Sequence, residues 1–221
     1  MMKLRLEKAE NLVEMVKIVN KLVTEGRFKV DETGFSITAI DPANVCMIHV
    51  KIDKSQFTEF DGKEDVNVNV SDFLDILKRA KSDDSISLNN EENTLNIEII
   101  GKTKKSYKMR LIEIEEKEQK LPNLTFTCEV NVSANELIKA VEDTEWIAES
   151  IVFTATKEKF VMNVDNDTGT TGSIEITPEI KTLKEEKVIG KYSTEYLKKL
   201  LCKGVSDKIA TRYSKDYPLQ L

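Results

Sequence analysis

The 221-residue sequence has few cysteines, a single histidine and no long apolar run. Its three cysteines, Cys46, Cys128 and Cys202, are widely separated and form no CxxC pair, which argues against a zinc site and a disulfide framework. We expect all three to be small buried hydrophobic residues, with no bound metal or cofactor. No apolar segment approaches the ~18 residues that span a bilayer, and the N-terminus lacks a signal peptide's apolar stretch. These absences predict an intracellular protein.

Sequence signatures of catalysis are also absent. The chain has no glycine-rich phosphate loop, no GxSxG turn and no HExxH pair. Its histidine, His49, lies on the polar phase of an alternating segment, where exposure to solvent is expected. We interpret the acidic pairs Asp83-Asp84 and Glu115-Glu116 as turn and linker charge rather than as metal ligands. The sequence therefore predicts no catalytic residues and no enzymatic activity.

The charge balance is acidic, with 33 basic and 39 acidic side chains and a net charge of −6. A protein that binds nucleic acid by affinity alone generally has a basic surface, so this balance argues against one. Any role at DNA must depend on where the basic residues lie. Hydrophobic residues make up 40% of the chain and charged residues 33%, which is typical of a folded protein rather than a disordered one.

Most of the chain alternates apolar and polar residues, as residues 48–52, 66–70 and 95–99 do. This period of two predicts antiparallel strands with one face in solvent. Four segments have helical spacing of their apolar residues instead. They are residues 9–22, 72–81, 134–145 and 194–203. The serines that precede the last three segments are the predicted N-caps. They are Ser71, Ser133 and Ser193.

The order of these elements repeats along the chain. Phe35 and Ile37 find Phe160 and Met162 at an offset of 125 residues. The sequence thus predicts two copies of a β-α-β-β-β-α-β-β unit. We expect an N-terminal domain over residues 1–112, a linker over 113–125 that is rich in glutamate, and a C-terminal domain over 126–221. The second copy is short by roughly one hairpin, so we expect a truncated or incomplete chain.

Several short motifs occur in unbroken order over the whole chain. They are residues 34–37 (Gly-Phe-Ser-Ile), 41–45 (Asp-Pro-Ala-Asn-Val), 76–80, 107–112, 121–126, 167–169 (Asp-Thr-Gly) and 216–219 (Asp-Tyr-Pro-Leu). Each is weak alone, but their order and spacing resemble the proliferating cell nuclear antigen family of DNA sliding clamps, and its archaeal members in particular.

The resemblance implies an α+β fold of two tandem clamp repeats, with antiparallel sheets outside and helices lining a ring, the second repeat lacking its last hairpin. Three subunits would form this ring around duplex DNA. The ring would act as a DNA polymerase processivity factor and as a docking platform in DNA replication and repair, without chemistry of its own. It would lie at the nucleoid in the cytoplasm of an archaeon, or in a eukaryotic nucleus.

From the resemblance we expect the DNA-facing residues to be basic residues on or just after the helices. They are Lys17, Lys21, Lys78, Arg79, Lys81, Lys139, Lys198, Lys199 and Lys203. From the residues alone a solvated surface is the favoured interpretation, since helix dipoles favour cations at C-termini. Residues 8–22, 71–82, 133–146 and 193–203 together carry ten basic and nine acidic side chains, and the third segment has Lys139 alone against four acids. Such helices hold DNA weakly, which suits retention by topology rather than by affinity.

The resemblance also implies a docking pocket between the linker and a loop, although ordinary core packing explains these apolar residues equally well. The pocket residues would be Ile40, Val45, Met47, Leu121, Leu124 and Pro218. DNA polymerase, nucleases, ligases and a clamp loader would insert short peptides there.

Ring closure would pair a strand that contains Tyr107 with a neighbouring subunit's strand near residues 171–177. The implied interface residues are Lys105, Tyr107, Met109, Gly172, Ile174 and Ile176. A second hypothesis remains open, in which the chain is a ring subunit or monomer that recruits partners without encircling DNA by itself.

Overall fold

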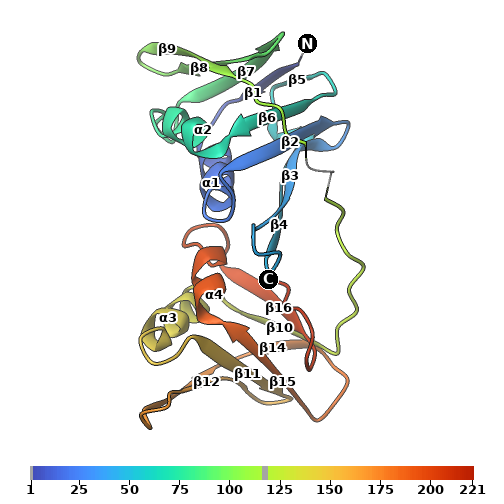
Figure 1. Ribbon diagram of the computed structural model, residues 1–221, viewed down its shortest axis with the longest axis vertical. Coiled ribbons are helices and arrows are strands. Elements are labelled where there is room, and N and C mark those ends of the chain that lie inside the picture. Colours follow the sequence, from blue (N-terminus) through green and yellow to red (C-terminus); the bar gives the residue numbers. More distant parts are fainter. Residues whose placement is uncertain (1, 116–118) are drawn as a thin grey trace. The chain divides into compact units, whose positions relative to one another are not determined.

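The computed structural model describes residues 2–115 and 119–221. It divides into two compact units, unit 1 (Met1–Pro122) and unit 2 (Asn123–Leu221), coloured blue to green and yellow to red in Figure 1. The division falls within the predicted linker. None of the helices in the described part of the chain is long and apolar enough to cross a membrane.

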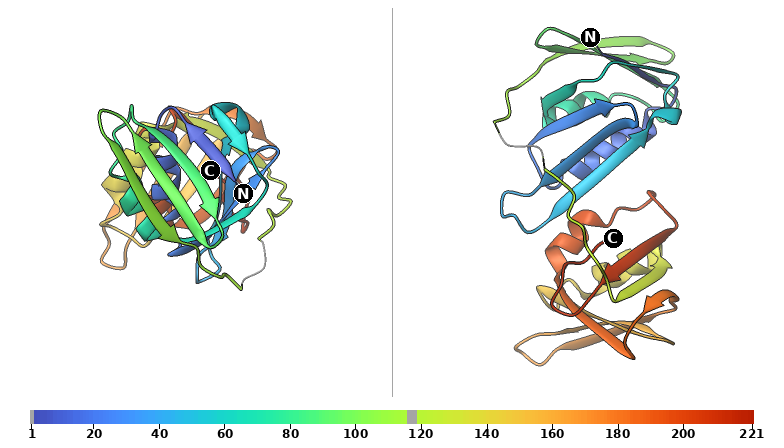
Figure 2. Two further views of the ribbon diagram at one scale, coloured as in Figure 1. Left: turned by 90° about the horizontal axis from the view of Figure 1, so that it is seen from above. Right: turned by 90° about the vertical axis from the view of Figure 1, so that its right-hand side faces the viewer.

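Unit 1 contains a five-stranded antiparallel sheet, in the order β5-β1-β7-β8-β9, and a four-stranded antiparallel sheet, in the order β4-β3-β2-β6. Its elements are β1 (Lys3–Leu6), α1 (Glu10–Val19), β2 (Glu25–Asp31), β3 (Gly34–Ile40), β4 (Met47–Asp53), the 3-10 helix η1 (Lys54–Gln56), β5 (Glu59–Asp61), β6 (Asp65–Asn69), α2 (Val70–Leu77), β7 (Ser85–Glu91), β8 (Thr94–Ile100) and β9 (Lys104–Arg110). Helices α1 and α2 lie side by side against the sheets (Figures 1 and 2).

Unit 2 repeats this arrangement with fewer strands. Its elements are β10 (Cys128–Ser133), α3 (Ala134–Thr144), β11 (Ser150–Thr156), β12 (Phe160–Asp165), β13 (Thr171–Ile176), β14 (Glu179–Leu183), β15 (Lys187–Ser193), α4 (Thr194–Leu200) and β16 (Lys208–Tyr213). The order β14-β10-β16 matches β5-β1-β7, and the order β13-β12-β11-β15 matches β4-β3-β2-β6. The hairpin β8-β9 has no counterpart among the described residues of unit 2.

The register of the strands supports the tandem repeat. Phe28 of β2 lies opposite Ile37 of β3, and Phe153 of β11 lies opposite Met162 of β12, each 125 residues further along the chain. The prediction of two tandem α+β repeats is therefore confirmed. The predicted unit was wrong in one respect, because five strands rather than three separate the helices of each repeat. The unit omitted two strands from each repeat, and the edge strands β5 and β14, which pair beside β1 and β10, account for one of the two.

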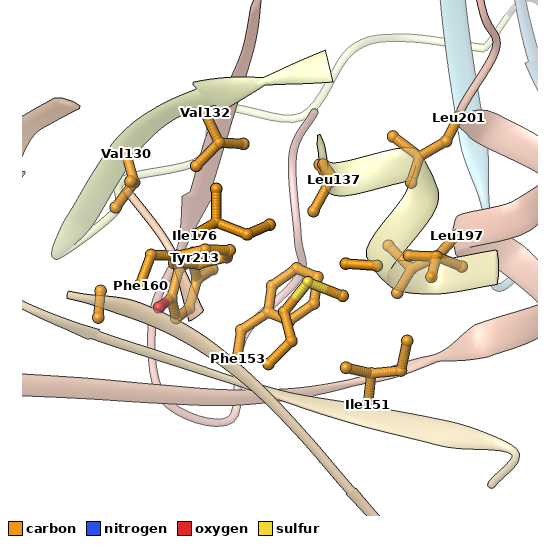
Figure 3. Packing of buried hydrophobic residues seen from close by; sticks show 14 of the residues in the cluster. Val130, Val132, Leu137, Ile151, Phe153, Phe160, Ile176, Leu197, Leu201 and Tyr213 are labelled. Carbon is orange, nitrogen blue, oxygen red and sulfur yellow. The ribbon is translucent and has the colours of Figure 1, made fainter. Parts of the chain in front are cut away.

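The core of unit 2 lies between its sheets and its helices. Phe153, Phe160 and Tyr213 are fully buried there, and side chains from β10, α3 and α4 converge on them (Figure 3). Ring centroids of Phe153 and Phe160 are 5.2 Å apart in an edge-to-face arrangement. The aromatic cluster thus joins β11, β12 and β16.

A glycine is required where β3 begins. Gly34 has φ of +148°, and a Cβ placed on it would lie 2.2 Å from the carbonyl oxygen of Ile52 on the neighbouring strand β4. Any other residue would force β3 and β4 apart. The Gly34-Phe35 pair of the sequence motif therefore has a structural reason.

The N-terminal caps of the helices differ from the predictions in two places, α2 and α4. Ser133 caps α3, since its hydroxyl accepts a hydrogen bond from the backbone N–H of Glu136 at 3.4 Å. Asn69 rather than Ser71 caps α2, and its side chain accepts from the N–H of Asp72 at 3.0 Å. The Ser71 hydroxyl instead donates to the Asn20 side chain at 2.8 Å, which draws it away from the helix end.

Ser193 occupies the N-cap position of α4, but its side chain makes no capping hydrogen bond. The helices α1, α2 and α4 also end earlier than predicted. The prediction for the cysteines holds for Cys46 and Cys128, which are buried, and is wrong for Cys202. Cys202 is half-buried because it follows the end of α4, on the way to β16.

Candidate functional site

The basic residues predicted in unit 1 gather at the ends of its two helices. Lys17 is exposed in the last turn of α1, where its Nζ lies 3.1 Å from a carboxylate oxygen of Glu14. Lys78 caps the C-terminus of α2 and lies 3.5 Å from Asp75. Each of these lysines is thus paired with an acid of its own helix, as the i, i+3 spacing allows.

The other three basic residues of unit 1 lie beyond the helices, which end at Val19 and Leu77. Arg79 donates from Nε to the carbonyl oxygen of Asp75 at 3.2 Å. Lys21 and Lys81 are exposed in the turns that follow α1 and α2. The backbone N–H of Lys81 donates to the Asp84 carboxylate at 3.0 Å, which identifies Asp84 as a turn-forming residue.

In unit 2 the predicted lysines of α4 make ion pairs with α3. Lys198 lies 2.6 Å from Glu145 at the end of α3. Lys203, in the loop after α4, lies 2.8 Å from Glu142. Two of the four acidic residues of the third helical segment, Glu142 and Glu145, therefore pair with lysines on or just after α4.

The two remaining predicted lysines of unit 2 differ in their surroundings. Lys199 lies 2.5 Å from Glu195, and its Nζ is 5.2 Å from the centre of the Tyr196 ring. Lys139 is exposed on α3. All nine predicted basic residues thus lie on or just after a helix, and at least five of them are already paired with a carboxylate.

Sequence reasoning missed an exposed aromatic residue in unit 2. Trp146, the only tryptophan of the chain, follows the end of α3 and is 72% exposed. Its indole N–H donates to the carbonyl oxygen of Asp143 at 2.9 Å, which fixes one edge of the ring. The repeat offset of 125 residues places Trp146 at the position of Lys21, and this offset could have drawn attention to it.

The predicted subunit interface lies on two edge strands. Within the described part of the chain, β9 pairs only with β8, and β13 pairs only with β12. On β9, Tyr107 lies opposite the fully buried Ile97, so its side chain is on the core-facing side, half-buried at the edge of the sheet. On β13, the half-buried Ile174 lies opposite the fully buried Met162. Each edge therefore carries apolar surface that its own unit covers incompletely.

The remaining predicted interface residues lie on the same faces. Lys105 and Met109 flank Tyr107, and the Lys105 ammonium donates to the carbonyl oxygen of Arg79 at 2.6 Å. Gly172 and Ile176 flank Ile174, and Ile176 is buried against the core of unit 2. Three of the six predicted interface residues thus lie on β9 of unit 1, and the other three lie on β13 of unit 2.

The predicted docking residues of unit 1 surround the turn from β3 to β4. Ile40 lies opposite Met47 on the solvent-facing side of these strands, and both are half-buried. Val45 is 66% exposed at the tip. The buried carboxylate of Asp41 accepts hydrogen bonds from the N–H groups of Val45 and Cys46 at 2.8 and 2.7 Å, which holds the tip in place. Sequence reasoning used Asp41 only as part of a motif and missed this role.

The start of the predicted linker packs against the same face of unit 1. Arg27 of β2 donates from its guanidinium group to the carbonyl oxygen of Ile114 at 2.7 Å. A cavity of about 90 Å³ is lined by Ile40, Ile114 and Gln119 among others. Ile40, which is predicted for docking, thus lines the same cavity as the linker residues Ile114 and Gln119.

The last three docking residues are divided between the units. Leu121 belongs to unit 1 and is 56% exposed, whereas Leu124 and Pro218 belong to unit 2. Leu124 is half-buried and Pro218 is exposed. Their assembly with Ile40 into one pocket stays a prediction.

Three titratable groups in or against the core of unit 2 have pKa values that burial raises. Burial raises the pKa of the Cys128 thiol to about 11 and that of Tyr192 to about 12. Burial also raises the pKa of Tyr213, whose hydroxyl lies 3.5 Å from the carbonyl oxygen of Val188. All three groups are neutral at physiological pH, as their packing in and against the core requires.

His49 is exposed, as predicted, and its Nδ1 lies 2.8 Å from the Thr38 hydroxyl on β3. The described residues include no group of three or more acidic, histidine or cysteine side chains that could hold a metal ion. Of the acidic pair Glu115-Glu116, Glu115 is exposed and Glu116 lies outside the described residues.

A family model described as the proliferating cell nuclear antigen, N-terminal domain, matches residues 1–120, which is more than half of the chain. The chain belongs to the proliferating cell nuclear antigen family. This membership confirms the resemblance inferred from the sequence motifs.

Family relatives match nearly the whole chain. The DNA polymerase sliding clamp of Pyrococcus horikoshii is 31% identical over 224 residues, covering 97% of this chain and 89% of the relative. The DNA polymerase sliding clamp of Thermococcus sibiricus is 32% identical over 222 residues, covering 96% and 88%. A crystal structure of PCNA from Thermococcus kodakaraensis superposes with a TM-score of 0.91 at 25% identity, covering 99% of this chain and 92% of that one. The sliding-clamp fold is therefore confirmed over both units, with relatives from archaea.

Proposed function

We propose that this chain is one subunit of a DNA sliding clamp, a ring that encircles duplex DNA and keeps DNA polymerase on it. The relatives named DNA polymerase sliding clamps support this function. The observation that carries the mechanism is the pair of edge strands β9 and β13, because each leaves core-facing apolar side chains half-covered. An uncovered strand edge is a template for pairing with another chain.

In the proposed ring, β9 of one subunit pairs with β13 of the next. Such pairing adds backbone hydrogen bonds and joins the two sheets into one. Tyr107 would then lie against the row of Gly172, Ile174 and Ile176, so that the cores of two subunits become continuous. Unit 1 offers one edge and unit 2 the other, which allows the contact to repeat around a closed trimer.

Retention on DNA would come from encirclement rather than from affinity. At least five of the nine predicted DNA-facing residues already hold a carboxylate within 3.5 Å. Proteins that bind DNA by charge neutralise many phosphates and lose affinity steeply with salt. A closed ring needs only weak contacts, and weak contacts permit sliding.

Partner enzymes would dock on the exposed apolar residues around Val45 and Leu121, by inserting a short helical turn. We expect DNA polymerase, nucleases, ligases and a clamp loader to use this surface in turn. The clamp itself would perform no catalysis, and in an archaeal cell it would work in the cytoplasm at the nucleoid.

The proposal is tested by retention on closed and linear DNA. The full chain is placed on nicked circular plasmid with ATP and a clamp loader from an archaeal relative, and the plasmid is then isolated by gel filtration at high salt. Wild-type protein should stay on circles and leave plasmid that has been linearised. Tyr107→Ala should sediment as a monomer and be lost from circles as well. Lys108→Ala, on the exposed side of the same strand, should behave as wild type.

Protein that leaves closed circles as fast as linear DNA would contradict the proposal. A stable wild-type monomer that still binds polymerase peptides would favour a docking module that does not encircle DNA. A Tyr107→Ala variant that remains trimeric would move the subunit interface to other residues.

A further inference from the structure

The lysines of unit 2 that would face DNA are held by acidic residues of the neighbouring helix. The Lys198–Glu145 and Lys203–Glu142 pairs, at 2.6 and 2.8 Å, join α4 and the loop after it to α3. The lysine side chains remain 60% and 68% exposed, so DNA could reach them. A phosphate that approached either lysine would meet the paired carboxylate first or displace it.

Unit 1 presents a different charge pattern. Its helical segments, residues 8–22 and 71–82, carry six basic and four acidic side chains. The corresponding segments of unit 2, residues 133–146 and 193–203, carry four basic and five acidic side chains. The three cations Lys78, Arg79 and Lys81 gather at the end of α2, where Lys78 lies 3.5 Å from Asp75 of its own helix. The pairs that Lys198 and Lys203 of unit 2 make with acids of α3 are closer, at 2.6 and 2.8 Å.

We infer that Glu142 and Glu145 of α3 mask Lys203 and Lys198, so that the helical surface of unit 1 supplies most of the electrostatic contact with DNA. The inference rests on the proposed function, because it assigns the DNA contacts of the ring unequally to the two repeats. A lysine whose charge is already balanced gains little by exchanging a carboxylate for a phosphate. The displaced carboxylate would also stay close to the phosphate and repel it.

Exposed ion pairs contribute little to folding stability. Both glutamates can therefore be replaced without loss of the fold, and the masking can be removed on its own. The variant Glu142→Gln/Glu145→Gln keeps side-chain size and releases the two lysines. The matched control is Glu136→Gln/Glu149→Gln, which changes net charge equally at two exposed residues for which no ion pair is found in the described structure.

Binding of the full-length variants to a short linear duplex is measured by fluorescence anisotropy across a series of salt concentrations. Glu142→Gln/Glu145→Gln should bind at least about fivefold more tightly than the control variant at low salt, and its salt slope should steepen by up to about 0.9 for each released lysine. Adding Lys198→Ala and Lys203→Ala to this variant should abolish the gain. The same lysine replacements in the wild type should change little, whereas Lys78→Ala/Lys81→Ala should flatten the salt slope.

Equal affinities and slopes for the two glutamine variants would overturn the masking, as would a large loss on replacing Lys198 and Lys203 in the wild type. Neither result would affect retention of the wild type on closed circles, which tests the ring itself. Failure of that retention would remove the proposed function and leave the charge measurement to stand separately.

Discussion

Phe28 in unit 1 and Phe153 in unit 2 occupy matching positions in the strand register, yet their neighbours differ. Phe28 stacks on Phe35 at 5.2 Å and meets the edge of another phenylalanine, Phe73, at 5.8 Å. Phe153 meets Phe160 at 5.2 Å and also the rings of Tyr192 and Tyr213. The phenylalanine at this position thus packs against apolar rings in unit 1, and against one apolar and two ionisable rings in unit 2. The repeat preserves shape and burial while the chemistry of the core changes.

The largest expected effect comes from truncating these two phenylalanines. Phe28→Ala and Phe153→Ala each remove a fully buried ring, which typically costs about 3–5 kcal/mol of unfolding free energy. If each unit has its own core, each variant should destabilise its own unit only. Urea unfolding followed by methyl NMR signals from both units measures this. Equal loss in both units after either replacement would show that they unfold as one.

A smaller effect is expected at alkaline pH, and only in unit 2. In the folded protein burial raises the pKa of Cys128 from 9.0 to about 11 and that of Tyr192 from 10.0 to about 12. Their neutral forms therefore contribute stability that is fully present below pH ~9 and is lost as pH rises through the folded pKa values. Unit 2 should lose roughly 2–3 kcal/mol between pH 7.5 and pH 10.5.

Urea unfolding at both pH values, again resolved by unit, measures this loss. Cys128→Val is the matched control, because it removes the titrating thiol and keeps an apolar side chain in the core. The variant should lose less stability than the wild type over the same pH range. Unit 1 losing as much as unit 2 would contradict the assignment to these buried groups.

The smallest expected effect concerns the helix caps. Asn69→Ala should destabilise unit 1 by about 1 kcal/mol, because it removes the side chain that caps α2. Ser133→Ala should cost unit 2 somewhat less, since its capping bond is longer at 3.4 Å. Ser193→Ala should be nearly neutral, as its side chain makes no capping bond. Thermal unfolding curves of the three variants would rank them, and a large effect of Ser193→Ala would contradict the assignment.

Sequence alone predicted the helices and strands that are determined by the pattern of neighbouring residues. The alternation in residues 95–99 predicted β8, and Ser133 with its helical apolar spacing predicted α3. The strand β5 escaped prediction because three residues, Glu59–Asp61, are too short to show a period. Ser71 was wrongly assigned as a cap because its partner, Asn20, is the residue that ends α1, 51 residues earlier in the sequence. Bonds between distant elements decided these exceptions.

The same division holds for the candidate site. The sequence shows that the third helical segment has more acidic than basic residues. It does not show which lysines these acids pair with, because only the packing of α3 against α4 brings Glu145 to Lys198. The motif that contains Asp41 was recognised by resemblance, whereas the hydrogen bonds that its carboxylate accepts from the N–H groups of Val45 and Cys46 appear only in the folded chain. The resemblance assigned Ile40, Val45, Met47, Leu121, Leu124 and Pro218 to one pocket, and that assignment stays a prediction.

The exposure of Trp146 has a consequence for optical measurements. Because the chain contains one tryptophan, its emission on excitation near the red edge of protein absorbance comes from a single place, the turn after α3. Asp143 in the last turn of α3 and Glu149 after it carry negative charge, whereas Glu145 is paired with Lys198, so the local field should concentrate caesium ions and repel iodide. The unlabelled protein should therefore be quenched more by caesium than by iodide. Any molecule that settles over this turn would shield the indole from both ions, and a spectrofluorimeter would follow its arrival in real time.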